Sequence, residues 1–224
     1  MQPDDSPSLA DRQRIALRLL HAAGILPIVT VDSIDQARAV AEALQRGGLR
    51  SIEVTLRTPV ALAAITTLKH EYPELVVGAG TVLTPDQIDA AAQAGADFLV
   101  TPGTSASMMF ALAAASLPVV PGAATPSELL TLAEHGFHVA KLFPAAAVGG
   151  IAMLKALHGP LPDFMFCPTG GISQADAGQY LAQPNVACIG GSWMVPRAWL
   201  QAGEFDKVAA SAAQARAIID AVRR

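Results

Sequence analysis

Three charged side chains stand out because they fall within segments that otherwise resemble buried strands. Lys141 lies in "HVAKLFPA", where most of its neighbours are apolar, and Glu53 and Arg57 lie in "SIEVTLR". Side chains alternate between the two faces of a strand, so Glu53 and Arg57 share one face while Ile52 and Val54 share the other. In a barrel the apolar face would meet the helices, and the three charges could converge at the interior.

Lys141 on a dry strand predicts chemistry with a carbonyl compound. Burial penalises the ammonium form, and a neutral amine can attack a carbonyl carbon to form a Schiff base. Phe143 shares a face with Lys141 and would exclude water. Glu53 could carry protons as a general acid/base, and Arg57 offers a planar fork for a carboxylate. The alternative is an internal Lys141–Glu53 ion pair without a catalytic role.

A second candidate site lies at two Gly-Gly pairs, in "PTGGI" and "GGSW". Glycine lets backbone amides approach an anion closely, and barrels often hold phosphate in the loops after the last two strands. Ordinary turn glycines are the alternative explanation. The candidate anion-binding residues are Thr169, Gly170, Gly171, Gly190, Gly191 and Ser192.

Two further residues lie late in apolar segments, where a barrel places its active site. Thr81 follows "VGAG", and its hydroxyl could contact a substrate or cap a helix. Pro102 in "VTPG" could shape a pocket wall or simply end a strand.

The elements that must position these residues alternate regularly. Eight short apolar segments begin 20 to 26 residues apart, with Ala- and Leu-rich segments of helical spacing between them. This alternation predicts βα units, and eight of them predict an α/β protein of the (β/α)8, or TIM, barrel class. Two extra helices are expected, at about residues 9–22 and 204–222. The strands should begin near Ile25, Ser51, Leu75, Phe98, Pro118, His138, Asp163 and Val186.

Local signals mark where helices should begin and end. Thr-Pro pairs beginning at Thr58, Thr84 and Thr125 can each supply an N-cap followed by proline at the first helical position. Four glycines fit positions just after helices. They are Gly24, Gly48, Gly95 and Gly136.

Composition narrows the function classes. The chain has 224 residues, 52% hydrophobic and 15% charged, with a net charge of -4, so no basic nucleic-acid footprint is expected. No apolar run is long enough to cross a membrane, and no signal peptide is recognised at the start. Cys167 and Cys188 are expected to be buried free thiols in a reducing cytoplasm, with a disulfide as the alternative. One domain is predicted over residues 1–224, with residues 1–8 as a flexible arm.

Taken together, "IEVTLR", "GAGTV", "TPG", "KLFPA", "PTGGI" and "GGSW" resemble the class I aldolases that cleave 2-keto-3-deoxy-6-phosphogluconate (KDPG) and often 4-hydroxy-2-oxoglutarate (KHG). The resemblance extends from about Ile25 to Trp193. It implies a (β/α)8 barrel, a homotrimer, pyruvate and glyceraldehyde 3-phosphate as products, and no metal or organic cofactor.

The resemblance also implies a role for each motif residue. Lys141 would form the Schiff base and Glu53 would transfer protons. Arg57 and Thr81 would hold the keto-acid end of the substrate. Pro102 and Phe143 would line the pocket, and the Gly170–Gly171 amides and Ser192 would bind the distal phosphate.

Three other functions remain open from the sequence. One is an aldolase for the galactonate epimer, which differs at C4. Another is a phosphosugar isomerase or epimerase, in which Glu53 would be the base and Lys141 a charged anchor. The third is a non-catalytic module that binds a sugar phosphate.

Overall fold

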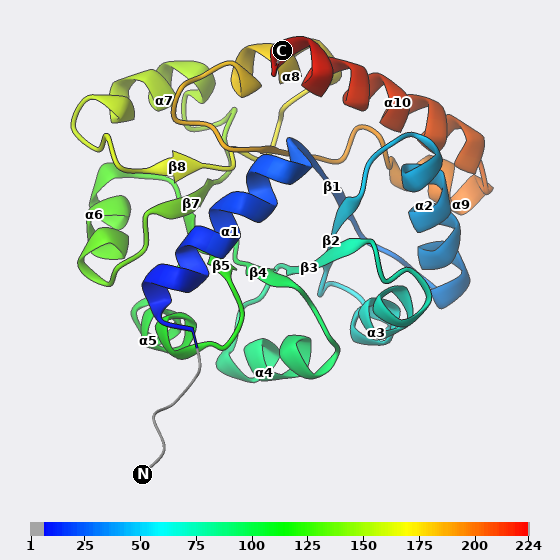
Figure 1. The fold of residues 1–224 in the computed structure, drawn as a ribbon, viewed down its shortest axis with the longest axis horizontal. Coiled ribbons are helices and arrows are strands. Elements are labelled where there is room, and N and C mark those ends of the chain that lie inside the picture. Colours follow the sequence, from blue (N-terminus) through cyan, green and yellow to red (C-terminus); the bar gives the residue numbers. More distant parts are fainter. Residues whose placement is uncertain (1–6, 224) are drawn as a thin grey trace.

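The computed structural model describes residues 7–223 and has an α/β architecture in which parallel strands curl around a common interior (Figure 1). Each of the eight predicted apolar segments contains a strand, which confirms the predicted alternation. The strands are β1 (Ile25–Val29), β2 (Ser51–Thr55), β3 (Val76–Gly80), β4 (Phe98–Val100), β5 (Val119–Val120), β6 (Gly122–Ala123), β7 (Val139–Leu142), β8 (Met165–Phe166) and β9 (Ile189–Gly191).

The strands pair in two parallel sheets. The first has the order β5-β4-β3-β2-β1-β9, and the second has the order β6-β7-β8. The fifth apolar segment supplies β5 and β6 rather than a single strand, and Pro121, which has no amide hydrogen, separates them. Two isolated parallel bridges, Phe166 to Val186 and Thr169 to Gly190, link the segments around β8 and β9.

Helices follow the strands and surround them (Figure 1). They are α1 (Leu9–Ala23), α2 (Ile34–Arg46), α3 (Ala61–Glu71), α4 (Pro85–Gln93), α5 (Ala106–Ala114), α6 (Pro126–Glu134), α7 (Gly150–His158), α8 (Gln174–Leu181), α9 (Arg197–Ala202) and α10 (Phe205–Val222). The two extra helices predicted at the chain ends are confirmed as α1 and α10. The short helix α9 was not predicted.

Two of the three predicted Thr-Pro caps are confirmed. Thr84 and Thr125 accept hydrogen bonds from the backbone amides of Gln87 and Glu128 at the starts of α4 and α6. The third prediction is wrong, because α3 begins at Ala61, and the Thr58 hydroxyl donates to the Val31 carbonyl instead. The four predicted helix-end glycines, Gly24, Gly48, Gly95 and Gly136, all have positive φ.

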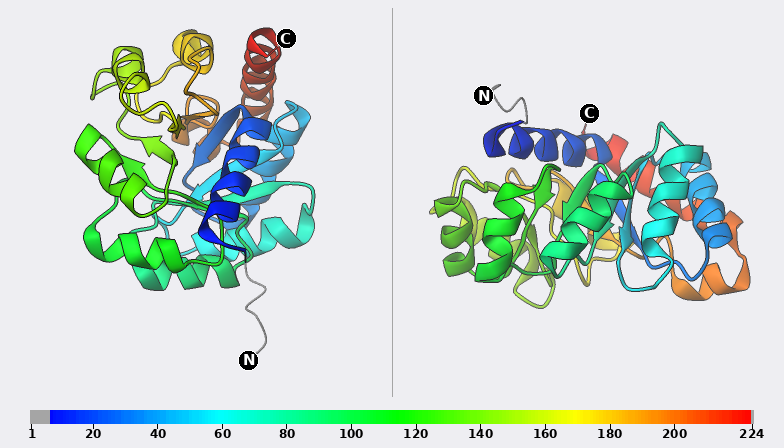
Figure 2. Two further views of the ribbon diagram at one scale, coloured as in Figure 1. Left: turned by 60° about the vertical axis from the view of Figure 1, so that its left-hand side comes forward. Right: turned by 90° about the horizontal axis from the view of Figure 1, so that it is seen from below.

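The helix α1 covers the end of the sheet that lies opposite α9 (Figure 2). Ala16 and Leu20 of this helix join a buried cluster with strand residues such as Val100 and Val120. Gln13 is buried there, and its side chain bonds to strand backbone at the same end. The opposite end, where the carboxyl ends of the strands lie, is not covered by α1.

The prediction that both cysteines are buried free thiols is confirmed. Cys167 and Cys188 are both free and buried, and burial raises the pKa of the Cys188 thiol. Within residues 7–223, no helix has the length and apolar character needed to cross a membrane. Of the predicted arm over residues 1–8, residues 1–6 lie outside the described part, and Ser8 is the N-cap of α1.

Candidate active site

A cavity of about 480 Å³ opens where the strands end. Most of the predicted site residues line it, although they come from four strands and the loops that follow them. Those residues are Glu53, Arg57, Lys141, Phe143, Thr169, Gly170, Gly171, Gly190, Gly191 and Ser192.

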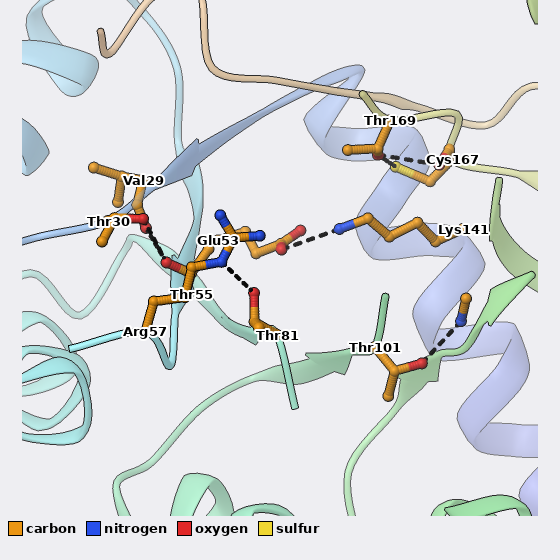
Figure 3. Close-up of polar contacts among 11 residues, drawn as sticks. Val29, Thr30, Glu53, Thr55, Arg57, Thr81, Thr101, Lys141, Cys167 and Thr169 are labelled. Atoms are coloured by element: carbon orange, nitrogen blue, oxygen red, sulfur yellow. Dashed lines mark hydrogen bonds and ion pairs between the residues drawn. The ribbon is translucent and has the colours of Figure 1, made fainter. Parts of the chain in front are cut away.

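Lys141 and Glu53 both line this cavity, and their side chains point toward each other (Figure 3). The Lys141 Nζ donates to Glu53 Oε1 at 3.2 Å, and only 7% and 2% of the two side chains are exposed. The Phe143 ring centroid lies 5.5 Å from the Lys141 Nζ, so an apolar wall adjoins the amine. The ion pair is therefore nearly dry, yet it faces a space large enough for a small molecule.

The fold makes room for the Glu53 carboxylate by placing glycine on the neighbouring strand. Glu53 in β2 is registered with Gly78 in β3, and Gly80 lies two residues further along. A Cβ added to Gly80 would lie only 2.1 Å from Glu53 Oε1. The absence of a side chain at Gly80 thus lets Glu53 occupy its position beside Lys141.

Arg57 extends from the end of β2 and is held by Thr81. The Arg57 Nε donates to Thr81 Oγ1 at 3.2 Å (Figure 3). Thr81 has φ 57°, a left-handed conformation that is rare for a β-branched residue and is typical of functional sites. The predicted helix-cap alternative for Thr81 is wrong, because Thr84 caps the following helix.

A second polar pair also lines the cavity, at the ends of β1 and β2. Thr30 Oγ1 and Thr55 Oγ1 lie 2.8 Å apart, and Thr55 Oγ1 also donates to the Val29 carbonyl oxygen at 3.1 Å (Figure 3). Thr55 lies on the predicted inner face of β2, whereas Thr30 was not predicted as a site residue. A signal for Thr30 existed, because it is a polar residue at the end of an apolar strand.

The glycine-rich loops form the other end of the cavity. Gly170 and Gly171 both line the cavity, and their φ values of 96° and 75° are conformations that strain any other residue type. A Cβ at Gly190 would lie 2.3 Å from Thr169 Oγ1, so this glycine permits the two loops to meet. Backbone amides and the Ser192 hydroxyl are thus the groups that this end offers to an anion.

Pro102 is not among the residues that line the cavity. A Cβ at Gly122 would lie 2.4 Å from the Pro102 carbonyl carbon, which shows close packing between these two backbones. Pro102 therefore packs against the backbone of β6 in this structure.

Several lining residues were not predicted as site residues from the sequence. Ile28, Thr30, Thr55, Ile172, Val195, Pro196 and Arg197 also face the cavity. Arg197 lies beyond the last strand in a helix that no periodic pattern revealed, and its place could not be inferred from motif spacing.

The chemistry of the cavity is that of charged and hydroxyl groups rather than metal ligands. Across residues 7–223, no group of three or more His, Cys, Asp or Glu side chains is arranged to hold a metal ion. A buried amine beside a carboxylate can form a Schiff base with the keto carbonyl of a 2-keto acid, with loss of water. The arginine and the glycine amides that line the same cavity can bind the carboxylate of such an acid and a second anionic group.

Comparison with known proteins agrees with this chemistry. The family model for KDPG and KHG aldolase matches residues 17–211. A 2-dehydro-3-deoxy-phosphogluconate aldolase from Pseudomonas aeruginosa is 46% identical over 190 residues, covering 85% of this chain and 86% of that protein. A KHG/KDPG aldolase from Escherichia coli is 43% identical over 197 residues, covering 88% of this chain and 92% of that protein.

The chain is also similar to a solved structure that contains covalently bound pyruvate. The KDPG aldolase of Legionella pneumophila, with pyruvate captured at low pH as a covalent carbinolamine intermediate, superposes with a TM-score of 0.86 at 40% sequence identity. The match covers 88% of this chain and 96% of that one. The protein therefore belongs to the KDPG and KHG aldolase family.

Proposed function

We propose that this protein is a class I aldolase that cleaves 2-keto-3-deoxy-6-phosphogluconate to pyruvate and glyceraldehyde 3-phosphate. It also cleaves 4-hydroxy-2-oxoglutarate to pyruvate and glyoxylate. The observation that carries the proposal is the Lys141–Glu53 contact of 3.2 Å at the wall of an open cavity. An ion pair with only a structural role would not require an open cavity beside it.

The first steps use the proton shared by this pair. Transfer of one proton from the Lys141 Nζ to Glu53 leaves a neutral amine and a carboxylic acid. The amine attacks the C2 carbonyl carbon, and Glu53 can return the proton to the departing oxygen as the carbinolamine loses water. The product is an iminium ion on Lys141, with the Phe143 ring helping to exclude bulk water.

The iminium ion then accepts the electrons of the breaking carbon–carbon bond. Loss of the C4 hydroxyl proton, with Glu53 as the proton acceptor, releases the aldehyde and leaves an enamine on Lys141. Protonation of the enamine at C3 gives the pyruvate imine, and hydrolysis frees pyruvate and the amine. Lysine itself supplies the electron sink, so the mechanism requires no metal or organic cofactor.

The remaining polar groups hold the two ends of the substrate. Arg57, supported by Thr81, binds the keto-acid carboxylate. The Gly170 and Gly171 amides and the Ser192 hydroxyl bind the distal phosphate. Pro102, through its packing, and Phe143 shape the wall between these two ends.

We also propose a closed (β/α)8 barrel that forms a single domain over residues 1–224. Two observations support closure. The segments β5 and β6 behave as one strand interrupted at Pro121, and the bridges at Phe166 and Thr169 join the second sheet to the β9 segment. We place this enzyme in the cytoplasm as a homotrimer, and its buried free thiols are typical of a reducing compartment.

Trapping the Schiff base tests this function directly. Incubation with pyruvate and borohydride should reduce the imine to a stable adduct on Lys141, and mass spectrometry of peptides identifies the modified residue. Lys141→Ala should lose both the adduct and pyruvate release from KDPG while circular dichroism shows an intact fold. Lys155→Ala, which removes an exposed lysine on α7, is the control and should retain both.

The alternatives predict other outcomes. An isomerase, an epimerase or a non-catalytic binding module would leave Lys141 unmodified, and no pyruvate would form in a lactate dehydrogenase-coupled assay. An aldolase for the galactonate epimer would form the adduct with pyruvate but would cleave that epimer faster than KDPG.

A further inference from the structure

A second arginine lines the cavity and has no part in the steps described above. Arg197 is the first residue of α9 and shares the cavity wall with Ser192 and Gly171. The Arg197 Nη2 donates to the two carboxylate oxygens of Asp32 at 3.0 and 3.1 Å. The cavity mouth therefore carries an ion pair whose cation borders the proposed phosphate site.

The pairing of β1 with β9 explains why these residues meet. The two strands run parallel with Pro27 opposite Gly191, so the chain leaves both of them at the same end. Asp32 lies in the loop after β1. Beyond β9, a turn in which the Val195 amide donates to the Ser192 carbonyl brings α9 beside the mouth, at the end remote from α1 (Figure 2).

The charges in the cavity leave Arg197 without a partner among the catalytic groups. Lys141 and Glu53 neutralise each other, and Arg57 contacts Thr81 at the proposed carboxylate end. Of the charged residues lining the cavity, Arg197 is the remaining one, and it follows the Gly190–Ser192 loop closely in the chain. Its guanidinium can therefore reach an anion bound there.

The Asp32 contact is weak enough for an anion to replace it. The Arg197 and Asp32 side chains are 62% and 37% exposed, and water attenuates ion pairs of this kind. A phosphate offers several acceptor oxygens and matches the planar fork of arginine, and such charge-assisted bonds are among the stronger hydrogen bonds. A phosphate also carries more negative charge than one carboxylate, so it can compete with Asp32 for the guanidinium.

We propose that Arg197 is a specificity-determining residue that leaves Asp32 to bind the distal phosphate of the substrate. This inference rests on the proposed aldolase function and deepens it. Arg197 raises the preference for phosphorylated over unphosphorylated keto acids. Asp32 competes with the phosphate and holds the guanidinium at the mouth between turnovers.

The test compares kcat/KM for KDPG with kcat/KM for KHG, which lacks the phosphate, in a lactate dehydrogenase-coupled assay. Arg197→Ala should lower the KDPG-to-KHG ratio about three- to fivefold, the size expected for one exposed charge contact. Arg197→Lys should restore part of this ratio because it keeps the charge. Asp32→Asn should raise the ratio because the competing carboxylate is gone, and added salt should reduce all these differences.

Arg46→Ala is the matched control. Arg46 donates to Asp206 at 2.9 Å and is 56% exposed, so its removal causes the same charge change away from the cavity. The inference would be overturned if Arg197→Ala had the same KDPG-to-KHG ratio of kcat/KM as Arg46→Ala. It would also be overturned if Asp32→Asn had a lower ratio than the wild-type protein. Borohydride trapping with pyruvate separates the two proposals, because a missing Lys141 adduct would refute the aldolase itself.

Discussion

At the residue scale, the Lys141–Glu53 contact combines two properties that seldom coincide. Both side chains are almost fully buried, which makes an unpaired charge on either of them costly, and both face a cavity of about 480 Å³. A substrate carbonyl entering this space meets an amine and a proton carrier that are already 3.2 Å apart. The pair is neutral as a whole, so one proton can move between its members without creating net charge.

Glu53→Gln tests proton transfer at this pair. The amide keeps the shape of the side chain but cannot accept a proton, so kcat for KDPG cleavage should fall by roughly 10²–10⁴-fold, the usual contribution of a general acid/base. Steady-state pyruvate release measures the loss. Glu42→Gln, an exposed carboxylate that accepts from the Tyr72 hydroxyl, is the control and should remain near the wild-type rate. A rate for Glu53→Gln within a few-fold of wild type would assign proton transfer to another group.

The residues of this pair were predictable because strand alternation is a strong constraint. In β2 the alternation places Glu53 and Arg57 on the inner face, and the same rule places Lys141 and Phe143 together in the sixth apolar segment. Arg197 follows no such rule. Its position depends on a turn and a short helix after the last strand, where neither periodicity nor a cap signal specifies direction.

At the element scale, a tertiary hydrogen bond distinguishes the predicted helix N-cap that is wrong from the two that are confirmed. Thr84 and Thr125 directly precede their helices, and each hydroxyl accepts a hydrogen bond from the backbone amide three residues later. Thr58 resembles them in sequence, but its hydroxyl bonds to the Val31 carbonyl of the neighbouring loop. The competing partner is 27 residues away, so local sequence could not reveal it.

The helix α1 closes the end of the sheet opposite the cavity through one side chain in particular. The Gln13 Nε2 donates to the Val119 carbonyl at 2.8 Å, and its Oε1 accepts from the amides of His138 and Val139 at 3.1 and 3.0 Å. One amide group thus satisfies three backbone groups on the β5 and β7 segments. This helix therefore stabilises the start of β7, the strand that carries Lys141.

Gln13→Ala tests this closure. The substitution leaves buried backbone groups without partners, so the free energy of unfolding should fall by about 1–3 kcal/mol. Urea denaturation monitored by circular dichroism measures the change. Gln214→Ala removes an exposed glutamine of α10 that bonds to Gln174, and it should change stability by no more than about 0.5 kcal/mol. Equal midpoints for the two variants would show that Gln13 does not hold the strands.

At the scale of the whole molecule, the order of strands and helices was predictable from the sequence. The places where strand pairing is interrupted or reduced to single bridges were not. Regular spacing of apolar segments reflects the repeated βα unit, and the structure contains a strand in each of them. The interruption at Pro121 and the isolated bridges near β8 depend on how distant segments fit together. Such features arise from packing among all the units, which no single segment encodes.

The outer surface bears on the proposed homotrimer. Phe110 on α5 is 69% exposed and Leu130 on the next helix, α6, is 53% exposed. The Phe110 ring packs edge-on against His135, with centroids 5.5 Å apart, so the two helices meet at this place. Large apolar side chains exposed on adjoining helices are typical of a surface that binds another protein chain.

Analytical ultracentrifugation tests the assembly. The wild-type protein should sediment with the mass of three 23.1 kDa chains, and Phe110→Glu should shift the mass toward that of one chain because it places a charge in an apolar contact. Ala152→Glu adds the same charge to an exposed position on α7 and should leave the trimer intact. A wild-type mass of 23.1 kDa at micromolar concentration would contradict the trimer. An intact Phe110→Glu trimer would instead place the contact on another face of the molecule, because a buried unpaired carboxylate opposes association.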